Sequence, residues 1–182
     1  MALTKVIGSG LGAIPAISGA NLTGLTDSQM PAGSVLQVVQ TFKNDVFSTT
    51  STSYADVTGL TASITPSSSS SKILVLLRTS QAMSSSDKMY TCLKRGSTAI
   101  AVANGKDYFS HMYPSRQGGT DSAIYIARGS THLDFLDAPS TTSSTTYKVQ
   151  MKVNAGTGYL NRGRDNDEFR GVSSIVLMEI AV

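Results

Sequence analysis

The sequence predicts an all-β protein, either a sandwich, a jelly roll or a barrel. Charged residues make up only 15% of the 182 residues, so Ser, Thr, Asn and Gln must cover much of the surface. That composition is typical of sheets, because a helical protein normally places Glu, Lys and Arg on its wet faces. Apolar and polar residues alternate with a period of two in many short segments, and turn residues separate these segments.

Residues 1 to 33 are predicted to form an extended arm, and residues 34 to 182 one folded domain. In the arm, isolated apolar residues are separated by Gly, Ser and Thr, which cannot build a core of their own. Such residues can dock one at a time into grooves on a partner. The candidate anchoring residues are Ile7, Leu11, Ile14, Ile17, Leu22 and Leu25.

The first half of the domain contains five predicted strands. Residues 35 to 42 are rich in β-branched and aromatic side chains and lie between two turns. Alternating apolar and hydroxyl residues predict the next three strands, in residues 46 to 50, 54 to 57 and 60 to 66. The continuous apolar run at 73 to 77 predicts a strand buried on both faces. In an oligomer one of its faces can meet another subunit, through Ile73, Val75 and Leu77.

The second half contains a hairpin, a long loop and four further strands. The hairpin joins residues 88 to 93 and 99 to 103 through a turn at Gly96. The loop spans residues 104 to 121, because it is aromatic and lacks periodicity. The remaining strands are expected at residues 122 to 128, 131 to 137, 147 to 153 and 173 to 182.

The long loop is the stretch that favours recognition of a partner. Tyr and Arg combine apolar area with hydrogen bonding, which places them at binding hot spots. The alternative is that the loop aromatics pack under the connection and close one end of the sandwich. The candidate recognition residues are Tyr108, Phe109, His111, Tyr113 and Arg116.

Several functional classes find no support in the composition. A net charge of +3 without a concentrated basic run argues against nucleic-acid binding. No apolar run reaches the roughly 18 residues that insertion into a membrane requires. Cys92 is the only cysteine, so an intrachain disulfide is excluded. The histidines His111 and His132 are too few for an ordinary zinc site.

The acidic cluster of Asp165, Asp167 and Glu168 has a spacing similar to that of calcium loops, but the glycine and closing glutamate of such a loop are missing. Neighbouring arginines compete for these carboxylates, so surface ion pairing is the favoured interpretation. Asp134 and Asp137 are three residues apart and fall on opposite strand faces, which makes them a poor catalytic pair. We therefore expect no catalytic residue, no metal site and no cofactor.

Four blocks of the domain resemble one family. They cover residues 33 to 40, 53 to 60, 64 to 75 and 173 to 180, and they begin Gly-Ser-Val-Leu-Gln, Ser-Tyr-Ala-Asp, Ile-Thr-Pro and Ser-Ser-Ile-Val. In this order they look like the virion surface proteins of tailed bacteriophages, especially marine and cyanobacterial ones, that carry a jelly-roll module. The resemblance implies an antiparallel β-sandwich of jelly-roll type, a homotrimer similar in plan to tumour-necrosis-factor-like trimers, a place on the virion surface and no enzymatic activity.

The arm and the domain together favour a capsid decoration or cement protein, or a short head fibre. The expected partners are further copies of the chain and the major capsid protein or a tail adaptor protein. An alternative is the tip of a receptor-binding tail fibre that adheres to host surface glycans. A carbohydrate-binding or hydrolytic β-sandwich is the alternative from a different class. If the first and last strands are neighbours, the arm leaves beside the carboxyl end.

Overall fold

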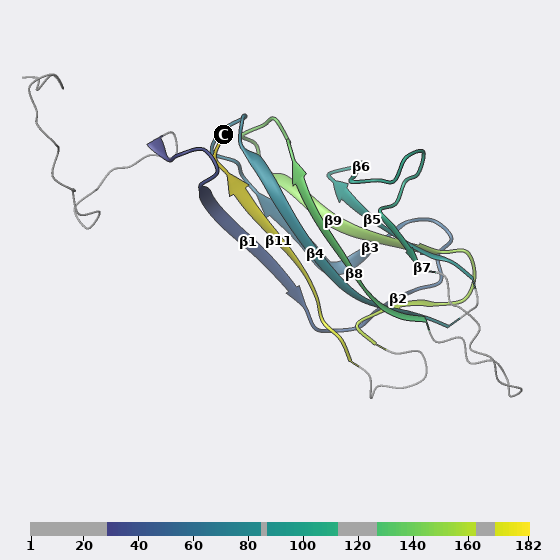
Figure 1. The fold of residues 1–182 in the computed structure, drawn as a ribbon. Coiled ribbons are helices and arrows are strands. Elements are labelled where there is room, and N and C mark those ends of the chain that lie inside the picture. The colour runs from purple at the N-terminus through teal and green to yellow at the C-terminus, as the bar shows by residue number, and fades with distance from the viewer. Residues whose placement is uncertain (1–28, 85–86, 113–126, 163–169) are drawn as a thin grey trace, which may run out of the picture.

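A computed structural model of the chain describes residues 29–84, 87–112, 127–162 and 170–182. In these residues eleven strands form two antiparallel sheets that pack face to face (Figure 1). The prediction of an all-β sandwich is therefore confirmed.

Sheet A has six strands and is organised around the long strand β4. One edge of β4 pairs with β11 and then with β10, and its other edge pairs with β8. Beyond these, β1 pairs with β11 and β2 pairs with β10. The strands are β1 (Val35–Lys43), β2 (Phe47–Thr49), β4 (Lys72–Met83), β8 (Ala127–Asp137), β10 (Gly158–Leu160) and β11 (Ser173–Ile180).

Sheet B has five strands, in the order β3, β9 and β5, followed by the short strands β6 and β7 that share the outer edge of β5. In β3 the register shifts between Asp56 and Thr61, and Gly59 within this irregularity has a φ of +79° that favours glycine. The strands are β3 (Ala55–Ile64), β5 (Met89–Arg95), β6 (Thr98–Ile100), β7 (Ser110–Met112) and β9 (Thr145–Val153).

The strand pairs are nested along the chain. The outermost pair is β1 with β11, followed inward by β3 with β9, β4 with β8, and β5 with β6 and β7. The first and last strands are therefore neighbours, which is the condition under which the arm was expected to leave beside the carboxyl end. The Gly33 amide donates to the Ala181 carbonyl over 2.8 Å, and the Ala181 amide donates to the Ser34 carbonyl over 2.9 Å. The described chain ahead of β1 thus enters the sheet beside the carboxyl end (Figure 1).

The core lies between the two sheets and follows from the period-2 alternation of the long strands. Two rows of side chains cross sheet A on its inner face, since the residues in each row are paired from strand to strand. The inner face of sheet B adds further apolar side chains, including the fully buried Tyr147. The two rows are Val39, Leu177, Val75 and Phe135, and Thr41, Ile175, Leu77 and Leu133.

Asp137 fastens sheet A to sheet B. It is 6% exposed and faces inward at the end of β8. The Arg95 guanidinium donates to its two oxygens over 2.8 and 2.9 Å, and the Tyr147 hydroxyl donates over 2.6 Å. Because a buried carboxylate without partners is costly, these donors from β5 and β9 fix the position of β8 relative to the other sheet.

Among the described residues, the strand predictions are correct in place but differ in extent. Of the strand predicted at residues 122 to 128, residues 122 to 126 lie outside the described residues and residues 127 and 128 begin β8. The segments 54 to 57 and 60 to 66 form one strand, β3, because the irregularity at Gly59 interrupts the pattern without ending the pairing. The predicted loop of residues 104 to 121 contains the short strand β7. Strand β10 was not predicted, since three residues are too few to show a period.

Candidate functional site

The three residues predicted to contact another subunit belong to the core instead. Ile73, Val75 and Leu77 are 0 to 1% exposed and pack between the sheets. They leave no surface for a second chain, so the prediction for these three residues is wrong. The residues between them, Leu74 and Leu76, face outward from sheet A and are only half-buried. The apolar run therefore contributes residues to both faces of β4. The sequence alone does not show which of these faces packs into the core.

The outer face of sheet A is apolar across four strands. Val38 on β1, Met178 on β11, Leu74 on β4 and Leu136 on β8 are paired in register and form one row. Val38 and Leu136, at the two ends of that row, are 56% and 55% exposed. We call this row and the apolar residues next to it the sheet A patch. Its remaining members are Val35, Phe42, Leu76, Val176 and Ile180.

The predicted recognition loop is divided by the structure. Tyr108 lies against the outer face of sheet B, whereas Phe109 packs toward the core and donates its amide to the Thr91 carbonyl over 3.2 Å. His111 belongs to β7 and is exposed. Tyr113 and Arg116 lie outside the described residues, as do all six anchoring residues of the arm.

A row of rings and one amine crosses the outer face of sheet B, and we call it the tyrosine row. Its members are Tyr54, Lys152, Tyr90, Tyr108 and His111. The Lys152 ammonium lies 4.4 Å from the ring centre of Tyr54 and 5.2 Å from that of Tyr90. The ring centres of Tyr90 and Tyr108 are 4.9 Å apart, those of Tyr108 and His111 are 5.7 Å apart, and those of Tyr90 and His111 are 6.5 Å apart.

The cross-strand register of sheet B explains why these side chains meet. Tyr90 on β5 is paired with Lys152 on β9 and with His111 on β7. Paired residues present their side chains on the same face, so the three lie next to one another. The sequence does not single out Tyr54, Tyr90 or Lys152, because an isolated Tyr or Lys in an alternating strand indicates only an outward position. Only the pairing of distant strands shows that they adjoin the loop.

Asp107 connects the loop to the tyrosine row. Its carboxylate accepts a hydrogen bond from the Tyr54 hydroxyl over 3.2 Å and from the Lys152 ammonium over 3.3 Å. Burial by itself raises the pKa of Asp107, but these bonds to the charged form outweigh it and hold the pKa below its ordinary value. Burial and the nearby Asp107 charge raise the pKa of Tyr54. At neutral pH Asp107 is therefore a carboxylate and Tyr54 a protonated phenol.

The environment of Cys92 does not activate its thiol as a nucleophile. Its side chain is fully buried in β5, and burial raises the pKa of the thiol more than the nearby Lys94 ammonium lowers it. The thiol is therefore protonated at neutral pH, and a protonated thiol is a poor nucleophile.

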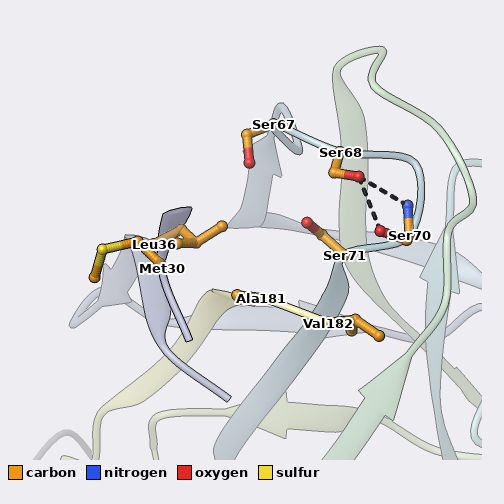
Figure 2. Close-up of a pocket in the computed structure, with 8 residues that line it drawn as sticks. All are labelled: Met30, Leu36, Ser67, Ser68, Ser70, Ser71, Ala181 and Val182. Carbon is orange, nitrogen blue, oxygen red and sulfur yellow. Dashed lines mark hydrogen bonds between the residues drawn. The ribbon is translucent and has the colours of Figure 1, made fainter. Parts of the chain in front are cut away.

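A pocket of about 400 Å³ opens where the chain enters β1 beside the carboxyl end (Figure 2). The Ser68 and Ser70 hydroxyls, at its rim, are 2.9 Å apart and share a hydrogen bond. The lining side chains offer the pocket hydroxyl groups and apolar surface. It is lined by Met30, Leu36, Ser67, Ser68, Ser70, Ser71, Ala181 and Val182.

Glu179 lies next to this pocket and is fully buried on the inner face of β11. The Ser67 amide and hydroxyl each donate to one carboxylate oxygen over 2.7 Å, and the Gln37 amide donates to the other over 2.5 Å. Burial raises the pKa of Glu179, but the bonds from Gln37, Ser67 and Ser71 outweigh this and hold the pKa below its ordinary value. The carboxylate is thus a structural acceptor that anchors the loop after β3.

The described residues contain no group of three or more His, Cys, Asp and Glu side chains that could hold a metal ion. His111 lies on β7 of sheet B and His132 on β8 of sheet A, so the fold does not bring the two histidines together. Asp165, Asp167 and Glu168 lie outside the described residues. Asp134 is exposed and Asp137 is buried, which places them on opposite faces of β8.

Within the described ranges, no helix is both long and apolar enough to pass through a membrane. Comparisons with protein-family models and with curated proteins find no match for this chain.

Proposed function

We propose that this chain is a non-enzymatic structural protein of a virion that associates with copies of itself, as a homotrimer, through the outer face of sheet A. The observation that carries the self-association is the sheet A patch. In an antiparallel sheet that faces water, the outer side chains are normally polar. Here one cross-strand row consists of Val38, Met178, Leu74 and Leu136, and the next row adds Val176 and Leu76.

A contiguous apolar surface of this kind typically marks a contact with another molecule. The second row ends on polar residues, with Gln40 opposite Val176 and Asp134 opposite Leu76. The charged Arg78 lies in the row beyond, opposite Ser174. An apolar centre with charges at its margin is the usual anatomy of a protein interface. Further copies of the same chain can bury the sheet A patch, so no other partner is needed. Closed oligomers of identical subunits are also the commonest assemblies.

The nested strand pairs support a jelly roll. A jelly roll has two sheets of antiparallel strands joined by Greek-key connections. The chain forms four nested strand pairs, of which β1 with β11 is the outermost and β5 with β6 and β7 is the innermost. These pairs are distributed over two sheets, because β11 also pairs with β4 in sheet A and β9 also pairs with β5 in sheet B. This arrangement agrees with the resemblance to phage surface proteins, on which the virion location rests.

Within a virion, an arm and a compact domain suit a decoration or cement protein, or a short head fibre. The arm would bind the major capsid protein or a tail adaptor protein, and the domain would stand on the surface. A tail-fibre tip that adheres to host glycans remains the second candidate, favoured by the aromatic side chains exposed on sheet B.

The self-association is tested by the mass of the purified chain in solution. We expect three times the chain mass of 19.1 kDa, and a single species of one chain mass at micromolar concentration would overturn the proposal. Replacing Leu74 and Met178 by Ser should give a folded monomer, since both are half-buried on the outer face. The matched control is Gln150→Ser on the outer face of sheet B, which should keep the wild-type mass.

The virion location requires a separate measurement. Antibody or gold labelling of the chain on intact particles, followed by electron microscopy, should place it on the capsid surface. Label at the tail tip would favour the second candidate, and a particle without label would contradict a virion role.

A further inference from the structure

We propose that the tyrosine row on the outer face of sheet B is a carbohydrate-binding surface. The row lies on the sheet opposite the sheet A patch, so carbohydrate binding there does not require self-association. The proposed surface contains no residue of the loop beyond Met112.

The rings supply the apolar part of the surface. Tyr54, Tyr90 and Tyr108 are partly exposed and His111 is exposed, although all four lie within one continuous group. A tyrosine combines a flat apolar face with a polar hydroxyl. The C–H faces of a sugar ring pack on such surfaces, and the sugar hydroxyls remain free to bond to neighbouring polar groups. A group of partly exposed rings on the wet side of a sheet matches that requirement.

Polar groups with fixed positions adjoin the rings. Asp107 is held by Tyr54 and Lys152. Further along β9, the Asp56 carboxylate accepts bonds from the Gln150 amide over 2.6 Å and from the Lys148 ammonium over 2.9 Å. A carboxylate has about four acceptor positions, so each aspartate can accept further bonds from hydroxyl groups. Binding sites for small polar ligands combine apolar surface with a few such oriented groups.

The same contacts favour a carbohydrate over a nucleic acid or a protein. Lys148 is paired with Asp56, and Lys152 with Asp107, so a carboxylate balances each of these two ammonium groups and weakens its attraction for a phosphate backbone. It also lacks the continuous aliphatic rows of the sheet A patch, which are what a protein partner would bury. Clustered rings next to paired charges fit a ligand that presents both C–H faces and many hydroxyl groups.

The test uses the full chain and three defined probes: maltohexaose, chitohexaose and oligogalacturonate, measured by isothermal titration calorimetry. We expect at least one of them to bind. Tyr90→Ala and Tyr108→Ala should each weaken that binding about tenfold or more, the loss typical of a central aromatic contact. His111→Ala should also weaken it, and because this side chain is exposed its removal should leave the fold intact.

The matched control is Tyr159→Ala. Tyr159 is a partly exposed tyrosine on β10 of sheet A, and its ring likewise contacts a cation, with the Arg162 guanidinium 4.8 Å from the ring centre. The Tyr159→Ala substitution should leave carbohydrate binding unchanged. Circular dichroism of every variant separates loss of binding from loss of fold. Absence of binding by all three probes at millimolar concentration, or binding that His111→Ala and Tyr108→Ala leave unchanged in folded protein, overturns the proposal. Neither result alters the mass expected for the trimer.

Discussion

Asn161 connects three segments that are distant in sequence. It is fully buried, and its side-chain amide donates to the carbonyls of Lys43 and Asp45 over 2.9 and 3.0 Å. Its side-chain oxygen accepts a bond from the Ser173 hydroxyl over 2.7 Å. Its φ of +63° lies in the left-handed region, which Asn tolerates better than most residues. One side chain therefore joins the ends of β1, β10 and β11.

Asn161→Ala should lower the free energy of unfolding by about 3 kcal/mol, because buried hydrogen-bonding groups lose their partners and Ala is strained at positive φ. Asn161→Gly removes the same bonds without the strain and should lose about 1 kcal/mol less. Denaturant unfolding of the two variants checks both values. Equal losses would show that backbone strain makes no contribution at this position.

Glu179 should make the stability depend on pH in the acidic range. Its pKa is lower in the folded protein than the ordinary value of 4.5, so the carboxylate form binds its donors and stabilises the fold above that pH. As the pH falls below 4.5, the folded protein loses this contribution until Glu179 is protonated in both states. The free energy of unfolding should therefore decrease from pH 6 to pH 3.

In Glu179→Gln the free energy of unfolding should decrease less between pH 6 and pH 3 than in the wild type. The variant should also be less stable at pH 7, since an amide nitrogen would face the donors of Gln37 and Ser67. Asp56→Asn is the control, because Asp56 also has a lowered pKa but is exposed on sheet B. A pH profile of Glu179→Gln that is parallel to the wild type would contradict the assigned role.

The strands of sheet A show how one element divides its residues between core and surface. Along β11 the burial alternates without interruption, so Leu177 lies in the core and Met178 lies in the sheet A patch. Leu177 and Met178 are adjacent and of similar size but face different environments. Substitutions at these two positions therefore measure core packing and self-association separately.

Leu177→Ala should lower the free energy of unfolding by about 2–5 kcal/mol, the usual cost of a cavity in a well-packed core. Met178→Ala should change the unfolding of the isolated subunit by less than about 1 kcal/mol but should weaken the oligomer. Chemical denaturation and sedimentation at several concentrations distinguish these effects. A loss of similar size for both variants would mean that the outer face is buried within the subunit.

The long strands could be predicted from the sequence because alternation and turn residues are local signals. Residues 147 to 153 alternate strictly and form β9 almost to the residue. These local signals do not predict which face of a strand is internal where that depends on the strands with which it pairs. The apolar run at 73 to 77 shows that both faces of β4 avoid water, but only its registry with β11 and β8 shows which face is internal.

The same limit explains the candidate site. Tyr108 and His111 were predicted because they belong to one aromatic stretch of sequence. Tyr54, Tyr90 and Lys152 come from three other segments, and their proximity results from the order of strands in sheet B. No sequence pattern in a single chain records that order.

At the scale of the whole molecule, the arm and the last strand should differ in their effect on folding. Deleting residues 2 to 30 removes nothing that pairs in either sheet among the described residues, so the product should be folded and soluble. From the role that we propose for the arm, we expect that this product no longer joins the virion. Deleting residues 173 to 182 removes β11, which lies between β1 and β4, and should prevent folding. Circular dichroism and particle incorporation assays check both truncations.

The pairing of β1 with β11 has a consequence for the connectivity of the chain. Because Gly33 and Ala181 are joined by a hydrogen bond, a short linker could connect Val182 to Gly33 without disturbing either sheet. New ends could then be opened in the exposed turn between β5 and β6, at Ser97. Such a circular permutant should fold to the same sandwich. It would present any fused peptide at that turn instead of beside the pocket.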